Sequence, residues 1–367
     1  MTRPTTKRLL LAGLLILPLA AFLTWTAFRQ APPAQTVAPP PFADSHNTLR
    51  PSQRARGQLS AGQSLTNLPT ARRLSAQHVL KYGSGAGDLG MIREREQPPV
   101  GPESFALGAD GTILVADVVN QRVVLYSADG AYLRSISLPG IALGDVMTDS
   151  QGRVYVYDQV RRALHQYDAD GTSRSTLDLN PKDIDTRGYF HVTGNAVYFA
   201  DAAVRDVLVA IVQDGALAAP DKSVERRTDG IHGESGRIYS MSLDKGQALR
   251  LQVRDAAVPA AARELQVPIP GIVSARYAGE DAAQRFYVQT ERLAGSSIVL
   301  EVLAFSPAGE LLATTRMPEN DYALWTAKLV DVRADGTIVQ FLPQKEQVKL
   351  NLFANQAAPG NDTLNRR

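Results

Sequence analysis

The stretch "DGTILVADVVNQRVVLYSADGAYLRSISL", residues 110–138, consists of short apolar runs separated by polar turns. The turns contain Asp-Gly pairs and the runs are rich in valine, leucine and isoleucine, which is typical of antiparallel strands joined by tight hairpins. A second stretch, "QGRVYVYDQVRRALHQYDADGTSRSTLDL", residues 151–179, has the same order of turns and runs 41 residues further on. The sequence therefore predicts a repeated unit of antiparallel strands.

The first turn of this unit can be followed through six copies along the chain. A repeat of about 40 to 50 residues with four short strands indicates a β-propeller, in which each copy forms one blade. Asparagine replaces glycine in the third copy, and asparagine tolerates the same left-handed turn conformation. The six turn positions are Gly111, Gly152, Asn195, Gly236, the pair Ala283 and Gln284, and Gly336.

The ring of blades needs a device that joins its two ends. The last copy, up to residue 353, contains three strands, whereas "AQHVLKY", residues 76–82, is a single strand before the first full copy. We expect this early strand to complete the last blade and to close the ring. The predicted fold is all-β, a six-bladed propeller over residues 76–353, with a disordered tail over residues 354–367.

The beginning of the first blade resembles an NHL repeat with its usual lead-in. The matching positions lie in a glycine run, two turns and the polar residues between the second and third strands; they are Gly83, Gly85, Gly87, Pro102, Asp110, Gly111, Ala116, Asp117, Asn120, Arg122, Asp129 and Gly130. The resemblance implies a six-bladed propeller. It does not imply one chemistry, because NHL-like propellers include protein-binding and RNA-binding platforms as well as lyases.

The N-terminus has the composition of a membrane segment. Arg3, Lys7 and Arg8 precede an uncharged apolar run over residues 9–28, which is long enough to span a bilayer. We expect residues 1–28 to be a signal anchor in a bacterial inner membrane, with the C-terminal domain in the periplasm. A cleaved signal peptide, and hence a secreted protein, is the alternative. Residues 29–75, rich in proline and arginine, are expected to be a flexible tether.

Composition excludes several classes of function. The chain contains no cysteine, so disulfides, thiolate metal sites and cysteine nucleophiles are absent. Residues 76–353 carry 28 basic and 35 acidic side chains, although the whole chain has a net charge of +2. An acidic propeller is an unfavourable partner for nucleic acid. We expect a monomer that binds an envelope protein or a small ligand.

One set of residues suggests chemistry at the propeller axis. The innermost strands should align Leu107, Thr148, His191, His232, Glu280 and Val332 at one level. Two imidazoles and a carboxylate form a plausible site for a divalent metal such as zinc, with His191, His232 and Glu280 as ligands. The alternative is that the histidines are packing residues between blades and that no cofactor is present.

These observations lead to two hypotheses of function. The first is a protein-binding or ligand-binding scaffold, favoured because no strong catalytic motif is found in the sequence. The second is a metal-dependent lyase or hydrolase with its site at the central axis.

Overall fold

The computed structural model describes residues 72–184, 188–201, 203–258, 262–321 and 323–355. The predicted anchor over residues 1–28 lies outside this part of the chain, as do residues 29–71 of the predicted tether and residues 356–367 of the predicted tail. In the described residues, no helix is long and apolar enough to cross a membrane. They form an all-β structure whose one helical element is a 3-10 turn at Pro181–Asp183.

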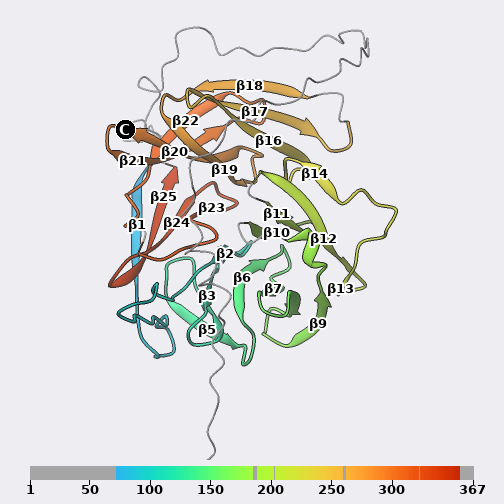
Figure 1. The fold of residues 1–367 in the computed structure, drawn as a ribbon, viewed down its shortest axis with the longest axis vertical. Coiled ribbons are helices and arrows are strands. Elements are labelled where there is room, and N and C mark those ends of the chain that lie inside the picture. Colours follow the sequence, from blue (N-terminus) through green and yellow to red (C-terminus); the bar gives the residue numbers. More distant parts are fainter. Residues whose placement is uncertain (1–71, 185–187, 202, 259–261, 322, 356–367) are drawn as a thin grey trace, which may run out of the picture. The chain divides into compact units, whose positions relative to one another are not determined.

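The described chain forms six antiparallel sheets, which are the blades of a propeller (Figure 1). Blades 1 to 6 follow one another in chain order, and the strands of each blade run in sequence from the axis outward, except that β1 is the outermost strand of blade 6. Blade 1 contains β2 (Phe105–Leu107), β3 (Ile113–Asp117), β4 (Arg122–Tyr126) and β5 (Tyr132–Ser137). Blade 2 contains β6 (Leu143–Thr148), β7 (Val154–Asp158), β8 (Ala163–Tyr167) and β9 (Ser173–Asp178).

The third blade has a fifth strand that the repeat does not predict. Blade 3 contains β10 (Tyr189–Thr193), β11 (Ala196–Ala200), β12 (Arg205–Gln213) and β13 (Ala216–Ala218), and β14 (Arg227–Asp229) also pairs with β12. Because β12 is long, β13 pairs with its last part and β14 with its first part. Blade 4 contains β15 (Ile231–His232), β16 (Arg237–Asp244), β17 (Ala248–Asp255) and β18 (Arg263–Pro268).

The last two blades complete the ring. Blade 5 contains β19 (Ile272–Glu280), β20 (Phe286–Ala294), β21 (Ser297–Phe305) and β22 (Leu311–Arg316). Blade 6 contains β23 (Val330–Val332), β24 (Ile338–Pro343), β25 (Gln347–Asn355) and, as its outermost strand, β1 (Arg72–Lys81). The prediction that an early strand closes the ring is confirmed, since β1 pairs with β25 from Arg72↔Asn355 to Lys81↔Gln347 (Figure 1).

The hairpin between the first and second strands of a blade depends on a left-handed residue. Gly111 and Gly152 have φ values of 84° and 77° at this turn. In blade 3 the left-handed residue is Gly194, with φ 60°, so the prediction that Asn195 takes this role is wrong by one position. In blade 5, where glycine is missing, Gln284 itself adopts φ 58°.

The hydrophobic core lies mainly between neighbouring blades. Phe105 of β2 stacks on Phe341 of β24 at 5.1 Å between ring centroids, and both side chains are fully buried. Phe286 and Phe305 stack in the same way within blade 5, at 4.8 Å. Each such buried aromatic ring stabilises the fold by about 2–3 kcal/mol. Packing between the faces of blades leaves the ends of the innermost strands free to line the axis.

Candidate functional site

A cavity of about 360 Å³ lies at the axis, where the six innermost strands end. Every blade contributes to its lining, and the six positions aligned from the sequence all take part: Leu107, Thr148, His191, His232, Glu280 and Val332. The volume is at the lower end of the roughly 300–1,000 Å³ that is usual for ligand pockets. The axial cavity can therefore hold a small molecule.

Two histidines of the lining share one buried carboxylate. His191 on β10 contacts Oδ1 of Asp206 through Nε2 at 2.9 Å, and His232 on β15 contacts Oδ2 through Nδ1 at 2.9 Å. The backbone N–H of His232 also donates to Oδ2, at 2.7 Å. Burial alone would raise the pKa of Asp206, but attraction to His191 and the hydrogen bonds from both histidines outweigh it and lower that pKa. The carboxylate thus fixes the two rings in neighbouring blades.

Aromatic packing fixes the same two rings from the side. Tyr198 on β11 stacks on His191 at 5.4 Å and on His232 at 4.4 Å between ring centroids. Because Asp206 accepts at Nδ1 of His232, this nitrogen carries the proton in the neutral ring, and Nε2 holds the free lone pair. In the described residues, no side chain or backbone group hydrogen-bonds to that Nε2. His232 is therefore oriented as a base or ligand would be.

Glu280, the third predicted metal ligand, is not brought to the two histidines. Its carboxylate accepts from the backbone N–H of Ser235 at 2.7 Å, from the Ser235 hydroxyl at 2.6 Å, and from the hydroxyl of Tyr239. Within the described ranges, no three His, Asp, Glu or Cys side chains are arranged to hold a metal ion. Glu280 is thus bonded to donors of blade 4, and the three-ligand metal site stays a prediction.

Four residues of the site were not predicted from the sequence, because none lies at the aligned level of an innermost strand. Asp206 lies on β12, where its position after Arg205 in an apolar strand was the only signal. Glu234 follows β15 in the hairpin turn, and its side chain is exposed at the cavity. Tyr189 and Tyr277 lie on β10 and β19 and also line the cavity.

Burial changes the acidity of several groups around the axis. Desolvation in the concave surroundings raises the pKa of Glu234. Attraction to His191 opposes this shift, and repulsion from Glu280 adds to it. Desolvation also raises the pKa values of Tyr189 and Tyr277, which keeps both phenols protonated at neutral pH. The Tyr189 hydroxyl is buried, and none of the residues that the structure describes forms a hydrogen bond with it.

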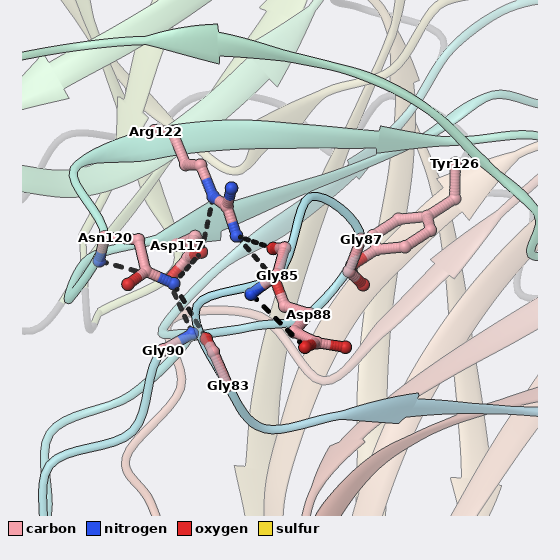
Figure 2. A network of polar contacts seen from close by, with 9 residues as sticks. All are labelled: Gly83, Gly85, Gly87, Asp88, Gly90, Asp117, Asn120, Arg122 and Tyr126. Carbon is pink, nitrogen blue, oxygen red and sulfur yellow. Dashed lines mark hydrogen bonds and ion pairs between the residues drawn. The ribbon is translucent and has the colours of Figure 1, made fainter.

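The residues that resemble an NHL repeat serve the architecture instead of the cavity (Figure 2). Asp117 is fully buried and accepts from the N–H of Gly90 at 2.8 Å and from Nε of Arg122 at 2.9 Å. Arg122 in turn donates to the carbonyls of Gly85 and Asp88 at 2.7 and 2.8 Å. These contacts bind the glycine-rich lead-in to blade 1.

Comparison with known proteins gives similarity of fold only. No protein-family model matches this chain, and no curated protein matches it in sequence. A member of the DUF4221 family from Bacteroides vulgatus is 12% identical over 78% of this chain and 98% of its own, with a TM-score of 0.45. Virginiamycin B lyase from Staphylococcus aureus is 12% identical over 72% and 99%, with a TM-score of 0.40. The WD40 repeats of RRP9 are 10% identical over 75% and 100%, with a TM-score of 0.42.

Proposed function

We propose that this protein is a binding propeller that takes a small polar ligand into the axial cavity. The observation that supports this most is the lining itself, where all six innermost strands end around one space and polar side chains are held by buried partners. Preformed concave sites with a few fixed polar groups are the usual form of small-ligand sites. Binding of a protein partner over the same face is compatible with this function.

The cellular setting of the proposal rests on the sequence. We propose that residues 9–28 anchor the chain in a bacterial inner membrane and that the NHL-like propeller acts as a monomer in the periplasm. The three basic residues before the apolar run support this orientation. Intact-mass analysis of protein extracted from membranes should find these residues retained. A mature N-terminus between residues 20 and 38 would instead indicate cleavage and secretion.

The test of ligand binding compares the full chain with a variant whose cavity is filled. Thr148 lines the axial cavity and is partly exposed, so Thr148→Tyr should occupy part of the space without removing a buried contact. Both proteins are dialysed to equilibrium against a small-molecule extract of bacterial envelope, and the retained molecules are identified by mass spectrometry. Molecules enriched by the natural chain and not by the variant support the proposal. Equal enrichment by both, or none by either, contradicts it.

A second candidate function, a lyase or hydrolase at the axis, is favoured by the orientation of His232. A base whose other nitrogen is held by a buried carboxylate is the arrangement of many general-base catalysts. The same arrangement is usual for histidines that bind a metal. A divalent metal such as zinc would find Nε2 of His232 available, whereas Glu280 would have to leave its present partners.

The metal hypothesis is tested by metal analysis of the purified full chain. The double substitution His191→Ala and His232→Ala should abolish bound zinc if these residues are ligands, and Glu280→Gln should weaken it. Two results would contradict a role for these residues as ligands. One is that the natural chain binds no zinc after loading, and the other is that the double variant binds as much zinc as the natural chain.

A further inference from the structure

The face of the propeller opposite the axial cavity carries an apolar tip on blade 5. Each innermost strand ends at the cavity, so the hairpin between the second and third strands lies at the other end of the blade, about 30 Å away along β20. In blade 5 this hairpin holds Leu293 and Ile298, which are both exposed and pair with each other across the turn. Residues 294–297 between them are alanine, glycine and two serines, so the tip has no charge.

Other exposed apolar side chains surround this tip. Gly271, just before β19, accepts from the backbone N–H of Leu293 and donates to the carbonyl of Gly246, which lies in the corresponding hairpin of blade 4. Leu243 and Val273, each within three residues of one of these glycines, are exposed as well. The hairpins of blades 4 and 5 are therefore bonded together and form one apolar edge.

A tryptophan belongs to the same face. Trp325, 59% exposed, lies in the loop that leads to β23, and β23 runs from this face toward the cavity. Arg276, three residues after Val273, donates to the carbonyl of Ala327, two residues after Trp325. Tryptophan has an apolar ring with one N–H donor, and it is enriched where lipid meets water.

The cavity face differs in charge and holds the start of β1. Arg72 donates to the hydroxyl of Tyr287 at 2.8 Å, and this hydroxyl donates to Asp281 of the cavity lining at 2.7 Å. The segment that precedes β1 therefore joins the propeller at the cavity face. The described lining includes two cations, Lys328 and Arg333, against the carboxylates of Asp149, Glu234, Glu280, Asp281 and Asp331. An acidic face of this kind is repelled by anionic lipid.

The length of residues 29–71 is compatible with contact between the opposite face and a membrane. A coil of this length has an average end-to-end distance of about 35 Å, and a blade is about 30 Å tall. A chain anchored by residues 9–28 can thus pass along the edge of the ring and still bring the face opposite the cavity to the bilayer. The anchor would also keep the effective concentration of lipid high, so a few apolar contacts are enough.

We propose that the face opposite the axial cavity rests on the lipid bilayer, with Trp325 and the blade 5 tip at Leu293 and Ile298 in the interfacial layer. This inference rests on the proposed anchor and specifies how the propeller is oriented, with the cavity open to the side away from the membrane. A bilayer suits side chains on separate tips because lipid adapts to them, whereas a protein partner needs a continuous complementary surface.

Trp325 can report the contact directly. The chain has two tryptophans, Trp25 and Trp325, so Trp25→Phe leaves Trp325 as the only one. The full chain with this substitution is reconstituted into vesicles of phosphatidylethanolamine and phosphatidylglycerol, prepared with and without brominated acyl chains, which quench tryptophan on contact. We expect bromination to lower the fluorescence of Trp325 at least about twofold, as for a ring in the interfacial layer.

Substitutions of exposed side chains locate the contact. Val273→Asp together with Leu293→Asp should remove most of the quenching, because a charge is costly in lipid. The matched control is Leu133→Asp, since Leu133 is as exposed as Leu293 but follows the turn at Ala128, whose carbonyl accepts from Arg333 of the cavity lining. This control should leave the quenching unchanged. All three side chains are exposed, so the thermal midpoints should stay close to that of the natural chain.

The anchor is tested in the same vesicles with Trp325→Phe, which keeps Trp25. Quenching of Trp25 without quenching of Trp325 would overturn the inference and leave the anchor standing. No quenching of Trp25 would overturn the anchor and the inference with it. Quenching of Trp325 that persists in the double variant would also overturn the inference. So would an unquenched Trp325 in a dimer that the double variant dissociates, because this face would then bind a second copy.

Discussion

Asp206 shows how one side chain on the third strand of a blade can organise a site at the axis. It is fully buried, and its two oxygens receive three hydrogen bonds from His191 and His232. A buried carboxylate is tolerated only where it is paired or fully hydrogen-bonded. The two histidines supply those bonds, and in return they lose their freedom to rotate.

Replacing Asp206 tests this arrangement. Asp206→Asn keeps the shape of the side chain but replaces one accepting oxygen by an NH2 group. Because that group would face a hydrogen-bond donor, at least one of the three buried hydrogen bonds must be lost. We expect the free energy of unfolding to fall by roughly 2–4 kcal/mol, measured by urea denaturation. Glu225→Gln, an exposed substitution, should stay within about 0.5 kcal/mol. A variant as stable as the natural chain would show that Asp206 does not hold the two rings.

Glu103, just before β2, gives a prediction about pH. Desolvation raises the pKa of its carboxyl from 4.5 to about 7 in the folded state. Between these values the folded chain holds a proton that the unfolded chain has lost, so this residue's contribution to stability is full below pH 4.5 and declines as pH rises to about 7. The loss amounts to at most about 3 kcal/mol.

The substitution Glu103→Gln separates this residue from the rest of the titration. The variant lacks the ionisable group, so its stability relative to the natural chain should rise from pH 5 to pH 8 and then level off. Denaturation curves recorded across this range measure the difference. A constant difference, or a gain toward low pH, would show that Glu103 is not desolvated.

At the residue scale, the sequence predicted positions better than contacts. The spacing of one repeat placed His191 and His232 on adjacent innermost strands, because repeat length determines which residues share a level. It could not show that Glu280 would contact Ser235 and Tyr239, since hydrogen bonds depend on side-chain direction and on turns that differ between blades. Asp206 was missed for the same reason.

At the element scale, Asp117 connects the lead-in to blade 1, whereas Asp201, at the same position of blade 3, makes local contacts. The carboxylate of Asp117 receives a bond from Gly90, 27 residues away. Among the described residues, Asp201 accepts only from Ala203 and Arg205. The two aspartates occupy equivalent positions in the repeat, but Asp117 bonds to a distant segment and Asp201 to its own turn. Substitutions at the two positions can therefore be compared directly.

We expect Asp117→Asn to release the lead-in from blade 1. Hydrogen exchange of residues 83–90 should accelerate, and stability should fall by roughly 2–3 kcal/mol. Asp201→Asn should cost less than about 1 kcal/mol, because Arg205, its ion-pair partner, is about half exposed to solvent. If both variants behave alike, the network of Figure 2 does not hold the lead-in.

Strand β1 is the element on which closure depends. Removing residues 72–81 would expose β25 as a free edge and remove Leu80 from the core shared by blades 1 and 6. We expect a loss comparable with the whole stability of a domain, about 5–15 kcal/mol, seen as failure to fold or a large fall in thermal midpoint. Deleting residues 29–70 should leave the midpoint unchanged. Equal midpoints for the two deletions would contradict closure by β1.

At the scale of elements, regular hairpins were predictable and irregular ones were not. Glycine turns and apolar runs determined the strands of blades 1 and 2, because both signals recur there in step. The extra strand β14 and the long strands of blades 4 and 5 depart from the repeat length. The pairing of these strands depends on contacts with neighbouring strands, and the spacing of the repeat carries no information about those contacts.

At the scale of the whole molecule, the axial cavity exists only when the ring is closed. Innermost strands contact their neighbours around the axis, including β23 of the last blade with β2 of the first. Each blade supplies one or a few lining residues, so no single stretch of sequence encodes the site. This explains why the spacing of the repeats predicted the fold, whereas the chemistry of the cavity depends on side chains from all six blades.

Whether the axis is the functional site is decided by where a bound ligand lies. Crystals of the full chain grown with the molecules that it enriches from envelope extract would show where they bind. We expect electron density inside the axial cavity, in contact with Glu234 or His232. Density on the outer edges of the blades, with the cavity free of ligand, would contradict the claim that the axis is the functional site.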